Sequence, residues 1–215
     1  MKLQYAITLN EPRSVDAVAQ QMSGSSRTAF TRTDVLTALG VLQGQERAGL
    51  ALIYAKYTKD KGETRRAVEA CAKVAVQLAG KLPVKERGKT QVIIAQGLAR
   101  LAVAEFSRTA DTPGAKCRCG GRGTVADEER LVELIVLASK PVDAPTKPCS
   151  RCRGTGLKPV PASRVYRAVA ALAPALSERT FYRQWQGLYD QLLAWCYTQE
   201  DRAERGYSRL TREAA

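Results

Sequence analysis

Two cysteine pairs, each followed by closely spaced glycines, constrain this chain more than any other feature. The first pair is Cys117 and Cys119, and the second is Cys149 and Cys152. A short turn can point two thiolates at one metal ion, and glycines after it permit the positive φ angles that bring backbone N–H groups back toward the sulfurs. Two such turns complete a tetrahedral shell, so we expect one bound zinc ion. Because a four-thiolate shell leaves no position for water, this zinc is expected to be structural.

Other interpretations of the cysteines are weaker. Unligated thiols in glycine-rich loops would bury little apolar surface, and a redox dithiol usually lies at the start of a helix that follows a strand. The two remaining cysteines, Cys71 and Cys196, lie on apolar faces of expected helices, so we predict that they belong to the core.

Composition narrows the class of protein. The chain has 215 residues, 45% of them apolar, and a formal charge of +13, which favours a polyanionic partner and above all nucleic acid. It contains no histidine, which excludes His-dependent triads and His-zinc hydrolases. The first residues lack the apolar core of a signal peptide, and no apolar run is long enough to span a bilayer. A cytoplasmic protein with reduced thiols and no membrane partner is therefore expected.

Apolar periodicity predicts a mainly α-helical fold: a helical bundle containing a C-terminal helix-turn-helix, with an inserted four-cysteine zinc finger. Helices are expected over 33–57 with a bend near Gly40 and Gly44, over 63–79, over 90–106 as a central buried helix, and over 162–199. Residues 131–137 suit either a helix or a strand. The expected organisation is a flexible arm (1–30), a helical region (31–115), a zinc-binding finger (116–160), helix-turn-helix-like helices packed on the helical region (161–199) and a charged, fraying tail (200–215).

Two consecutive helices near the C-terminus have the pattern of a helix-turn-helix. The first ends before Pro174, and Ser177 is placed to cap the second. The second helix has an apolar stripe formed by Phe181, Trp185, Leu188, Leu192 and Trp195. Arg179, Arg183 and Gln186 fall on its opposite face, where the first turn of a recognition helix contacts bases and phosphates. An ordinary helical hairpin with a solvated polar face remains the alternative.

Local charge favours DNA binding over the plain hairpin. Between residues 147 and 183 the only acid is Glu178. The basic residues there are Lys147, Arg151, Arg153, Lys158, Arg164, Arg167, Arg179 and Arg183. Binding of DNA through such a strip is expected to weaken steeply with salt.

An acidic cluster lies between the two cysteine pairs. It comprises Asp127, Glu128, Glu129 and Glu133. Negative charge is unsuited to DNA, so this cluster could contact a protein partner, or it could be a solvated face.

No catalytic constellation is present, and we expect a protein that is not an enzyme. Gly88-Lys89-Thr90 has the ending of a phosphate-binding P-loop, but the glycine required five residues earlier is Pro83.

Several segments together resemble the Q late-gene transcription antitermination proteins of lambda-like phages. They are Thr112 to Arg118, Cys149 to Gly156, Pro161 to Ser163, Tyr166 to Val169 and Leu188 to Asp190. The likeness is weaker from Thr33-Asp34-Val35 onward and covers about residues 31–197. Two departures concern the finger: the first pair is Cys-x-Cys where the family has Cys-x-x-Cys, and the segment between the pairs is longer.

The resemblance implies a function that the residues alone do not specify. Such a protein binds double-stranded DNA within a phage late promoter and engages paused host RNA polymerase holoenzyme, including its sigma factor. The polymerase then reads through terminators. NusA is a further expected partner, and the expected location is the cytoplasm of the bacterial host. The resemblance assigns the zinc ligands to Cys117, Cys119, Cys149 and Cys152. It assigns the DNA-contacting face to Arg179, Thr180 and Arg183, beside Ser177.

Two alternatives remain open. A zinc-containing repressor would bind DNA without altering read-through. The segment from Cys149 to Gly156 also has the Cys-x-x-Cys-x-Gly-x-Gly form of DnaJ-type chaperone zinc centres, although two knuckles rather than four argue against a chaperone. DNA binding that is sensitive to salt would favour a regulator over the chaperone module.

Overall fold

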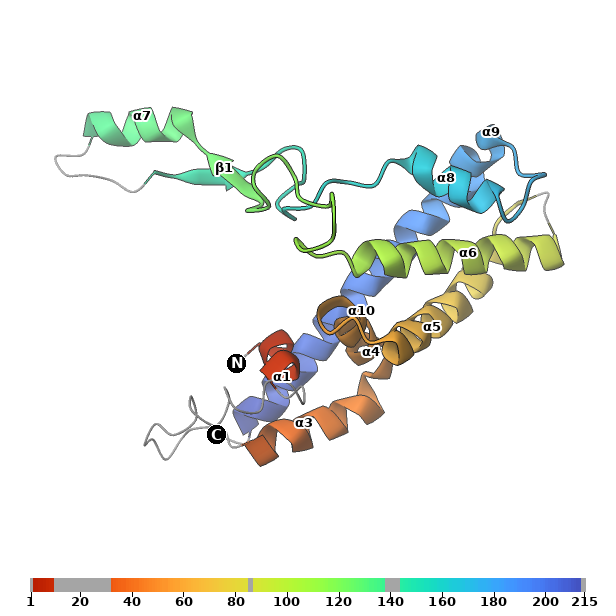
Figure 1. Cartoon of the computed structure of the whole chain (residues 1–215), viewed down its shortest axis with the longest axis horizontal. Coiled ribbons are helices and arrows are strands. Elements are labelled where there is room, and N and C mark those ends of the chain that lie inside the picture. The colour runs from red at the N-terminus through yellow and green to blue at the C-terminus, as the bar shows by residue number, and fades with distance from the viewer. Residues whose placement is uncertain (1, 10–31, 85–86, 138–143, 214–215) are drawn as a thin grey trace. The chain divides into compact units, whose positions relative to one another are not determined.

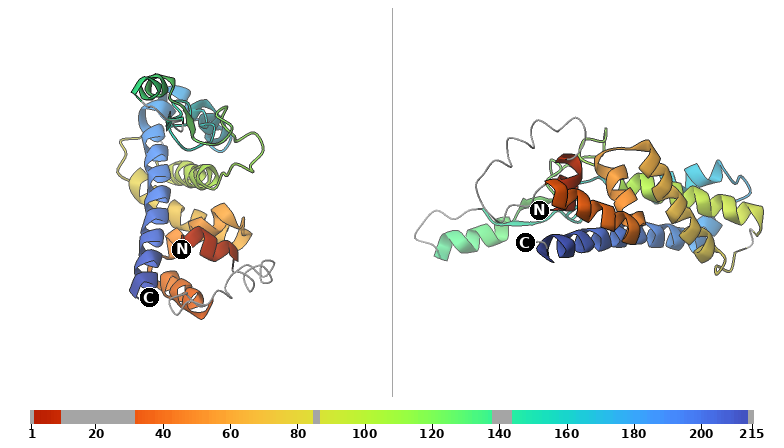
Figure 2. Two further views of the ribbon diagram at one scale, coloured as in Figure 1. Left: turned by 90° about the vertical axis from the view of Figure 1, so that its left-hand side faces the viewer. Right: turned by 90° about the horizontal axis from the view of Figure 1, so that it is seen from below.

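A computed structural model describes residues 2–9, 32–84, 87–137 and 144–213 (Figures 1 and 2). The chain separates into two compact units. The first combines Met1–Ser107 with Ala162–Ala215, and the second is Arg108–Pro161. None of the described helices is both long enough and apolar enough to cross a membrane.

The first unit is built from helices that pack along one long C-terminal helix. Its helices are α1 (Leu3–Leu9), α3 (Arg32–Gln45), α4 (Arg47–Tyr57), α5 (Lys61–Ala79), α6 (Lys89–Phe106), α8 (Ala162–Ala170), α9 (Glu178–Thr180) and α10 (Gln186–Glu213). Both views in Figure 2 show α10 running alongside the N-terminal helices. The prediction of a mainly helical protein is confirmed.

Helix α5 shows why these elements pack closely. Its N-cap is Asp60, whose carboxylate accepts a hydrogen bond from the Glu63 N–H. Its buried face is lined by the small residues Ala67, Cys71, Ala75 and Ala79, which lie four residues apart on one side of the helix. Cys71, and Cys196 on α10, are fully buried, as expected for core residues.

Helix α6 is central to the first unit but is not buried all round. Ile94, Leu98 and Phe106 are buried. Near its start, Val92 and Ile93 are 37% and 44% exposed, so the expectation of a central buried helix does not hold for its first turns.

The N-terminus differs from the expected flexible arm. Residues 3–9 form α1, with Leu3, Ala6 and Ile7 buried at one helical spacing. The Leu3 N–H donates to both carboxylate oxygens of Glu204 on α10, at 3.1 and 3.0 Å. A seven-residue helix is unstable alone, so α1 exists because tertiary contacts supply its core and its cap. Residues 10–30 of the expected arm lie outside the described residues.

The C-terminal tail also differs from expectation. Helix α10 continues to Glu213, and Ala203 and Tyr207 are buried in the cluster that holds α1, α3 and α4. Most charged residues of this segment, Asp201, Arg202, Arg205 and Arg209, are exposed, whereas Glu204 is half-buried and contacts α1. The expectation of fraying from residue 200 is wrong for 200–213.

The break in the first long helical stretch also differs in position. Gly40 and Gly44 both lie inside α3, and the chain turns at Glu46 before α4 begins. The expected bend therefore occurs a few residues later than either glycine.

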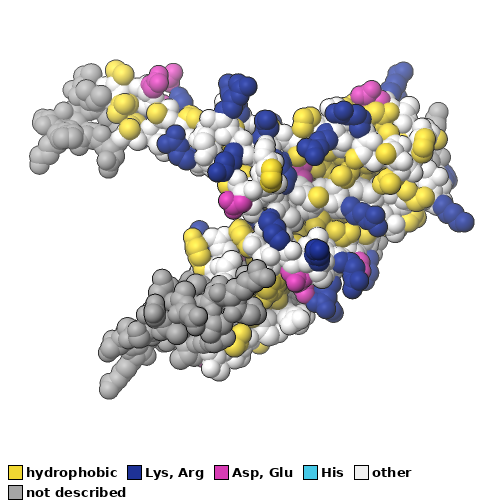
Figure 3. All heavy atoms as spheres, in the orientation of Figure 1, with side chains coloured by type: hydrophobic (Ala, Val, Ile, Leu, Met, Phe, Trp, Pro, Cys, Tyr) yellow, Lys and Arg dark blue, Asp and Glu magenta, His cyan; other side chains and the backbone are white. Residues whose placement is uncertain are grey.

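The second unit contains the cysteine pairs and a small sheet. Strands β1 (Thr124–Ala126) and β2 (Thr146–Pro148) are antiparallel, with Thr124 opposite Pro148. Helix α7 (Glu128–Leu137) follows β1, so residues 131–137 are helical. Figure 3 shows acidic side chains near α7 and many Lys and Arg side chains over the rest of this unit.

Candidate metal centre and paired C-terminal helices

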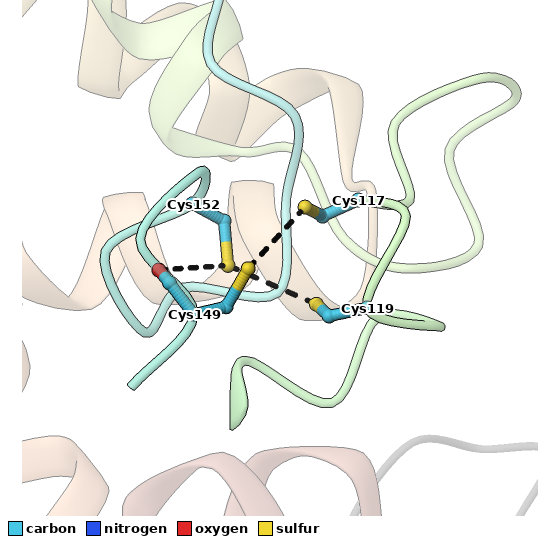
Figure 4. A group of neighbouring side chains, drawn as sticks. All are labelled: Cys117, Cys119, Cys149 and Cys152. Carbon is cyan, nitrogen blue, oxygen red and sulfur yellow. Dashed lines mark hydrogen bonds between the residues drawn. The ribbon is translucent and has the colours of Figure 1, made fainter. Parts of the chain in front are cut away.

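The four cysteines of the two pairs converge on one point (Figure 4). Their sulfurs all lie within 4.8 Å of one another, with 4.0 Å between Cys117 and Cys149 and 3.8 Å between Cys119 and Cys152. A tetrahedral zinc with Zn–S bonds of about 2.3 Å has sulfurs about 3.8 Å apart. All four side chains are buried. The donor set and the spacing therefore fit a tetrahedral metal ion.

Each cysteine pair and the glycines after it form a knuckle, residues 117–123 and residues 149–156. The backbone contacts between the two knuckles have an approximate two-fold symmetry. The Cys117 N–H donates to the Gly156 carbonyl at 2.9 Å, and the Cys149 N–H donates to the Gly123 carbonyl at 2.8 Å. The Lys116–Leu157 bridge likewise mirrors the pairing at the start of β1. Each knuckle thus uses its first cysteine and its last glycine to bind the other.

Two glycines permit this close approach. A Cβ on Gly123 would lie 2.2 Å from the Gly154 carbonyl oxygen, and one on Gly156 would lie 2.2 Å from that of Gly121. Both glycines also have positive φ angles, 78° and 72°. The sequence contains the signal for this pairing, since Cys-x-Gly-x-Gly occurs at Cys119 and again at Cys152. The one-residue difference between the pairs precedes this shared part, so it does not disturb the symmetry.

Backbone N–H groups favour the thiolate at two of the cysteines. The pKa of Cys149 is lowered to about 7, chiefly by the backbone N–H of Cys152 and also by that of Arg151. The pKa of Cys119 is lowered as well: desolvation acts to raise it, but the N–H groups of Gly123 and Gly121 and two neighbouring thiols outweigh that effect. Each knuckle therefore offers one cysteine that readily becomes a metal-binding thiolate.

The charged candidates of the second unit are mostly on its surface. Arg151, Arg153 and Lys158 are exposed. Glu128 and Glu129 are exposed in the first turn of α7.

Asp127 and Glu133, the other two acidic residues expected to contact a protein partner, are placed differently. Asp127 pairs with Lys147 across the small sheet at 3.2 Å, so it is tied to the fold. Glu133 belongs to α7, and its side chain lies outside the described part of the structure.

Residues 162–186 form two helices joined by a turn. Helix α8 is followed by the turn 171–177, and the next helix begins at Glu178. The Ser177 hydroxyl accepts a hydrogen bond from the Thr180 N–H at 3.2 Å, which confirms the expected cap. Phe181 and Trp185 are fully buried, and the Tyr166 ring of α8 lies 5.6 Å from that of Phe181.

The side chains of this region that were expected to contact DNA differ in their exposure. Arg164, Arg167, Arg179 and Arg183 are exposed, whereas Gln186 is half-buried. The Thr180 hydroxyl lies 2.8 Å from that of Ser177, so it takes part in the cap. On the inner side Trp195 is only partly buried, unlike the rest of its expected stripe.

One structural feature here was not anticipated. The backbone from Phe181 to Trp185 forms a π-helical turn, η2, between α9 and α10. Gln184 lies in this turn and donates from its Nε2 to the Pro83 carbonyl oxygen at 2.9 Å. With Arg179, Thr180 and Arg183 it lines an open hollow of about 480 Å³. Apolar periodicity alone does not reveal this π turn, because Phe181, Trp185 and Leu188 have the spacing of a regular α-helix.

The P-loop-like residues have an unrelated context. Lys89 and Thr90 start α6, and the described segment before Gly88 follows helix α5 rather than a strand. A nucleotide-binding P-loop requires a preceding strand, so this motif does not support one.

Comparison with known proteins agrees with the resemblance that the sequence carries. The family described as "Antitermination protein Q" matches residues 111–204. Antitermination protein Q of Salmonella phage P22 and that of Escherichia phage lambda are each 31% identical over 215 residues, covering 99% of this chain and 100% of each relative. Antitermination protein Q of Escherichia phage HK022 is 32% identical over 211 residues, covering 95% of this chain and 96% of that protein. The chain therefore belongs to the antitermination protein Q family of lambdoid phages.

Proposed function

We propose that this protein is a phage late-gene antitermination factor with a regulatory rather than a catalytic role. It binds double-stranded promoter DNA, engages paused host RNA polymerase holoenzyme through a surface that includes the sigma factor, and makes the polymerase resistant to terminators. NusA acts with it on the elongating polymerase. The observation that carries this proposal is similarity over nearly the whole chain to relatives named for antitermination.

The DNA-binding part of the proposal rests on residues 162–186. The exposed guanidinium groups of Arg179 and Arg183 lie in the first turns of a helix capped by Ser177. First-turn residues of a recognition helix contact base edges, and the free N–H groups there favour phosphate. Arg164 and Arg167, exposed on α8, supply further contacts to the DNA backbone. Ser177, Thr180 and Gln186 position or border this surface.

The second unit has a structural metal and two charged surfaces. One zinc ion bound by Cys117, Cys119, Cys149 and Cys152 would hold the two knuckles together, without any open coordination position. Arg151, Arg153 and Lys158 are exposed on these knuckles and suit a phosphate backbone. The exposed Glu128 and Glu129, with Glu133 on the same helix, suit a basic protein surface such as one on polymerase.

Single-round transcription by bacterial RNA polymerase tests the proposal. The template carries this chain's own late promoter followed by a terminator. We expect the protein to increase read-through, and we expect the variant Arg179→Ala/Arg183→Ala to lose most of that increase. The control variant Lys61→Ala/Arg65→Ala removes the same charge from the exposed side of α5 and should retain it. Unchanged read-through by a protein that still binds the promoter would indicate a repressor instead.

A further inference from the structure

The loop between α5 and α6 is joined directly to the proposed recognition helix. Gln184, in the π turn at the start of that helix, donates a hydrogen bond of 2.9 Å to the carbonyl oxygen of Pro83 in the loop. The next loop residue, Val84, is 4% exposed and so anchors the loop in the unit. Residues 101 positions apart in the sequence are thereby held beside each other.

The same loop carries exposed positive charge. Lys81, Arg87 and Lys89 are all exposed, at the end of α5 and the start of α6. Arg179 and Arg183 are exposed on the adjoining helix. Together with Gln184 they line the open hollow of about 480 Å³ at the start of that helix. Figure 3 shows Lys and Arg side chains at the end of the first unit where α6 begins and α9 lies. Glu178 is the acid in the first turn of that helix, so the positive groups outnumber it.

We propose that the two described ends of the α5–α6 loop form a second phosphate-binding element, which contacts the backbone of the same DNA duplex through Lys81 on one side and Arg87 and Lys89 on the other. Gln184 is a positioning residue that holds this loop beside the recognition helix. The inference rests on the proposed function, because it needs the helix that starts at Glu178 to lie on DNA.

The dimensions of DNA support this arrangement. An α-helix with its side chains is about 10–12 Å across, and the major groove is about 12 Å wide. A helix that enters the groove therefore has phosphates along both edges. A basic loop attached to the first turns of that helix lies where one of these edges runs. The amide of Gln184 is already bonded to the loop, so its N–H group serves to place the loop rather than to read a base.

The salt dependence of DNA binding tests the proposal. The probes are a fluorescent duplex of this chain's late promoter and a scrambled duplex of equal length, titrated between 50 and 200 mM salt. Each phosphate contact contributes about 0.9 to the slope of log K against log salt. The variant Lys81→Ala/Arg87→Ala/Lys89→Ala should therefore lower the slope by about 2.7 on both duplexes. The wild-type protein then loses about 40-fold more affinity than the variant across this range.

A charge-matched variant provides the control. Lys61→Ala/Arg65→Ala/Lys73→Ala also removes three positive charges, but from exposed positions along α5 before the loop. It should leave the slope close to that of the wild type. If the wild-type protein binds the promoter duplex and the loop variant shows the same salt slope as the wild type, the inference is wrong while the proposed function stands. If the wild-type protein binds neither duplex, both are wrong.

The role of Gln184 needs a measurement that simple destabilisation would not reproduce. Gln184→Met keeps the length of the side chain and removes both the donated hydrogen bond and a buried acceptor oxygen that has no partner among the described residues. We expect it to lower the salt slope although every Lys and Arg remains. Added to the loop variant, it should lower the slope no further. A loss of affinity with an unchanged slope would show that Gln184 does not position the loop.

Discussion

Replacing Gly156 by alanine would place a methyl group between the two cysteine knuckles. The new Cβ would lie 2.2 Å from the Gly121 carbonyl oxygen, and a Cβ essentially never approaches closer than 3.0 Å. The obstacle is backbone rather than the end of a side chain, so the knuckles must separate by most of an ångström. The hydrogen bond from the Cys117 N–H to the Gly156 carbonyl, 2.9 Å long, then breaks or stretches.

The size of the effect follows from two contributions. Placing any L-residue at a φ of 72° costs roughly 1–2 kcal/mol. The separation costs about 1–3 kcal/mol more, because it leaves a buried backbone group without its partner. That second contribution corresponds to a roughly 5- to 150-fold loss of zinc affinity, since each 1.4 kcal/mol is about tenfold.

Gly154→Ala is the matched control for this measurement. Its φ is also positive, 87°, but its Cβ would have no atom within 4 Å. Zinc affinity is measured for both variants by competition with a chromogenic chelator. We expect Gly156→Ala to bind zinc clearly more weakly than Gly154→Ala, and Gly123→Ala to behave like Gly156→Ala by the approximate symmetry. Equal affinities for Gly154→Ala and Gly156→Ala would refute the reasoning that backbone contact between the knuckles sets the sulfur positions.

Three further predictions address other parts of the chain. Cys152→Ser should release zinc and loosen the second unit, because loss of one ligand removes much of a binding free energy on the order of 10 kcal/mol. If atomic absorption finds a full equivalent of zinc in this variant, the site is contradicted. Arg183→Ala should weaken binding to promoter DNA by about 1–3 kcal/mol in a fluorescence titration if it contacts a base, and an equal loss on all duplexes would make it a phosphate contact. Glu204→Gln removes the charged acceptor of the Leu3 N–H and should weaken the docking of α1 by about 1 kcal/mol. The expected readout is faster amide hydrogen exchange in residues 3–9. An unchanged exchange rate would show that burial alone holds α1.

The metal-binding residues and most helices could be predicted from local patterns. Cysteine spacing and glycines pointed to the four sulfurs that the structure brings within 4.8 Å. Helices α5 and α6 follow from apolar periodicity, and Ser177 was recognisable as a cap because its hydroxyl bonds only three residues away. These features depend on neighbours in the sequence, so a single sequence carries enough information for them.

Other features depended on residues that are distant in the sequence. Helix α1 needs Glu204 and the core around Tyr207, more than 190 positions away, and the charged end of α10 stays helical because α1, α3 and α4 bury its inner side. The hydrogen bond from Gln184, in the π turn, to Pro83 likewise joins the α5–α6 loop to the second of the paired helices.

The sequence by itself therefore determined the chemistry of this protein: four thiolate ligands, a strong positive charge, a capped helix with exposed arginines, and membership of a phage regulator family. Only the tertiary structure decided how these parts are held. It paired the knuckles through glycine backbone contacts, docked both ends of the chain on each other, and placed a basic loop beside the proposed recognition helix. The physical reason is that local hydrogen bonds and apolar periodicity act over a few residues, whereas burial and close backbone approach join segments whose separation in sequence leaves no local trace.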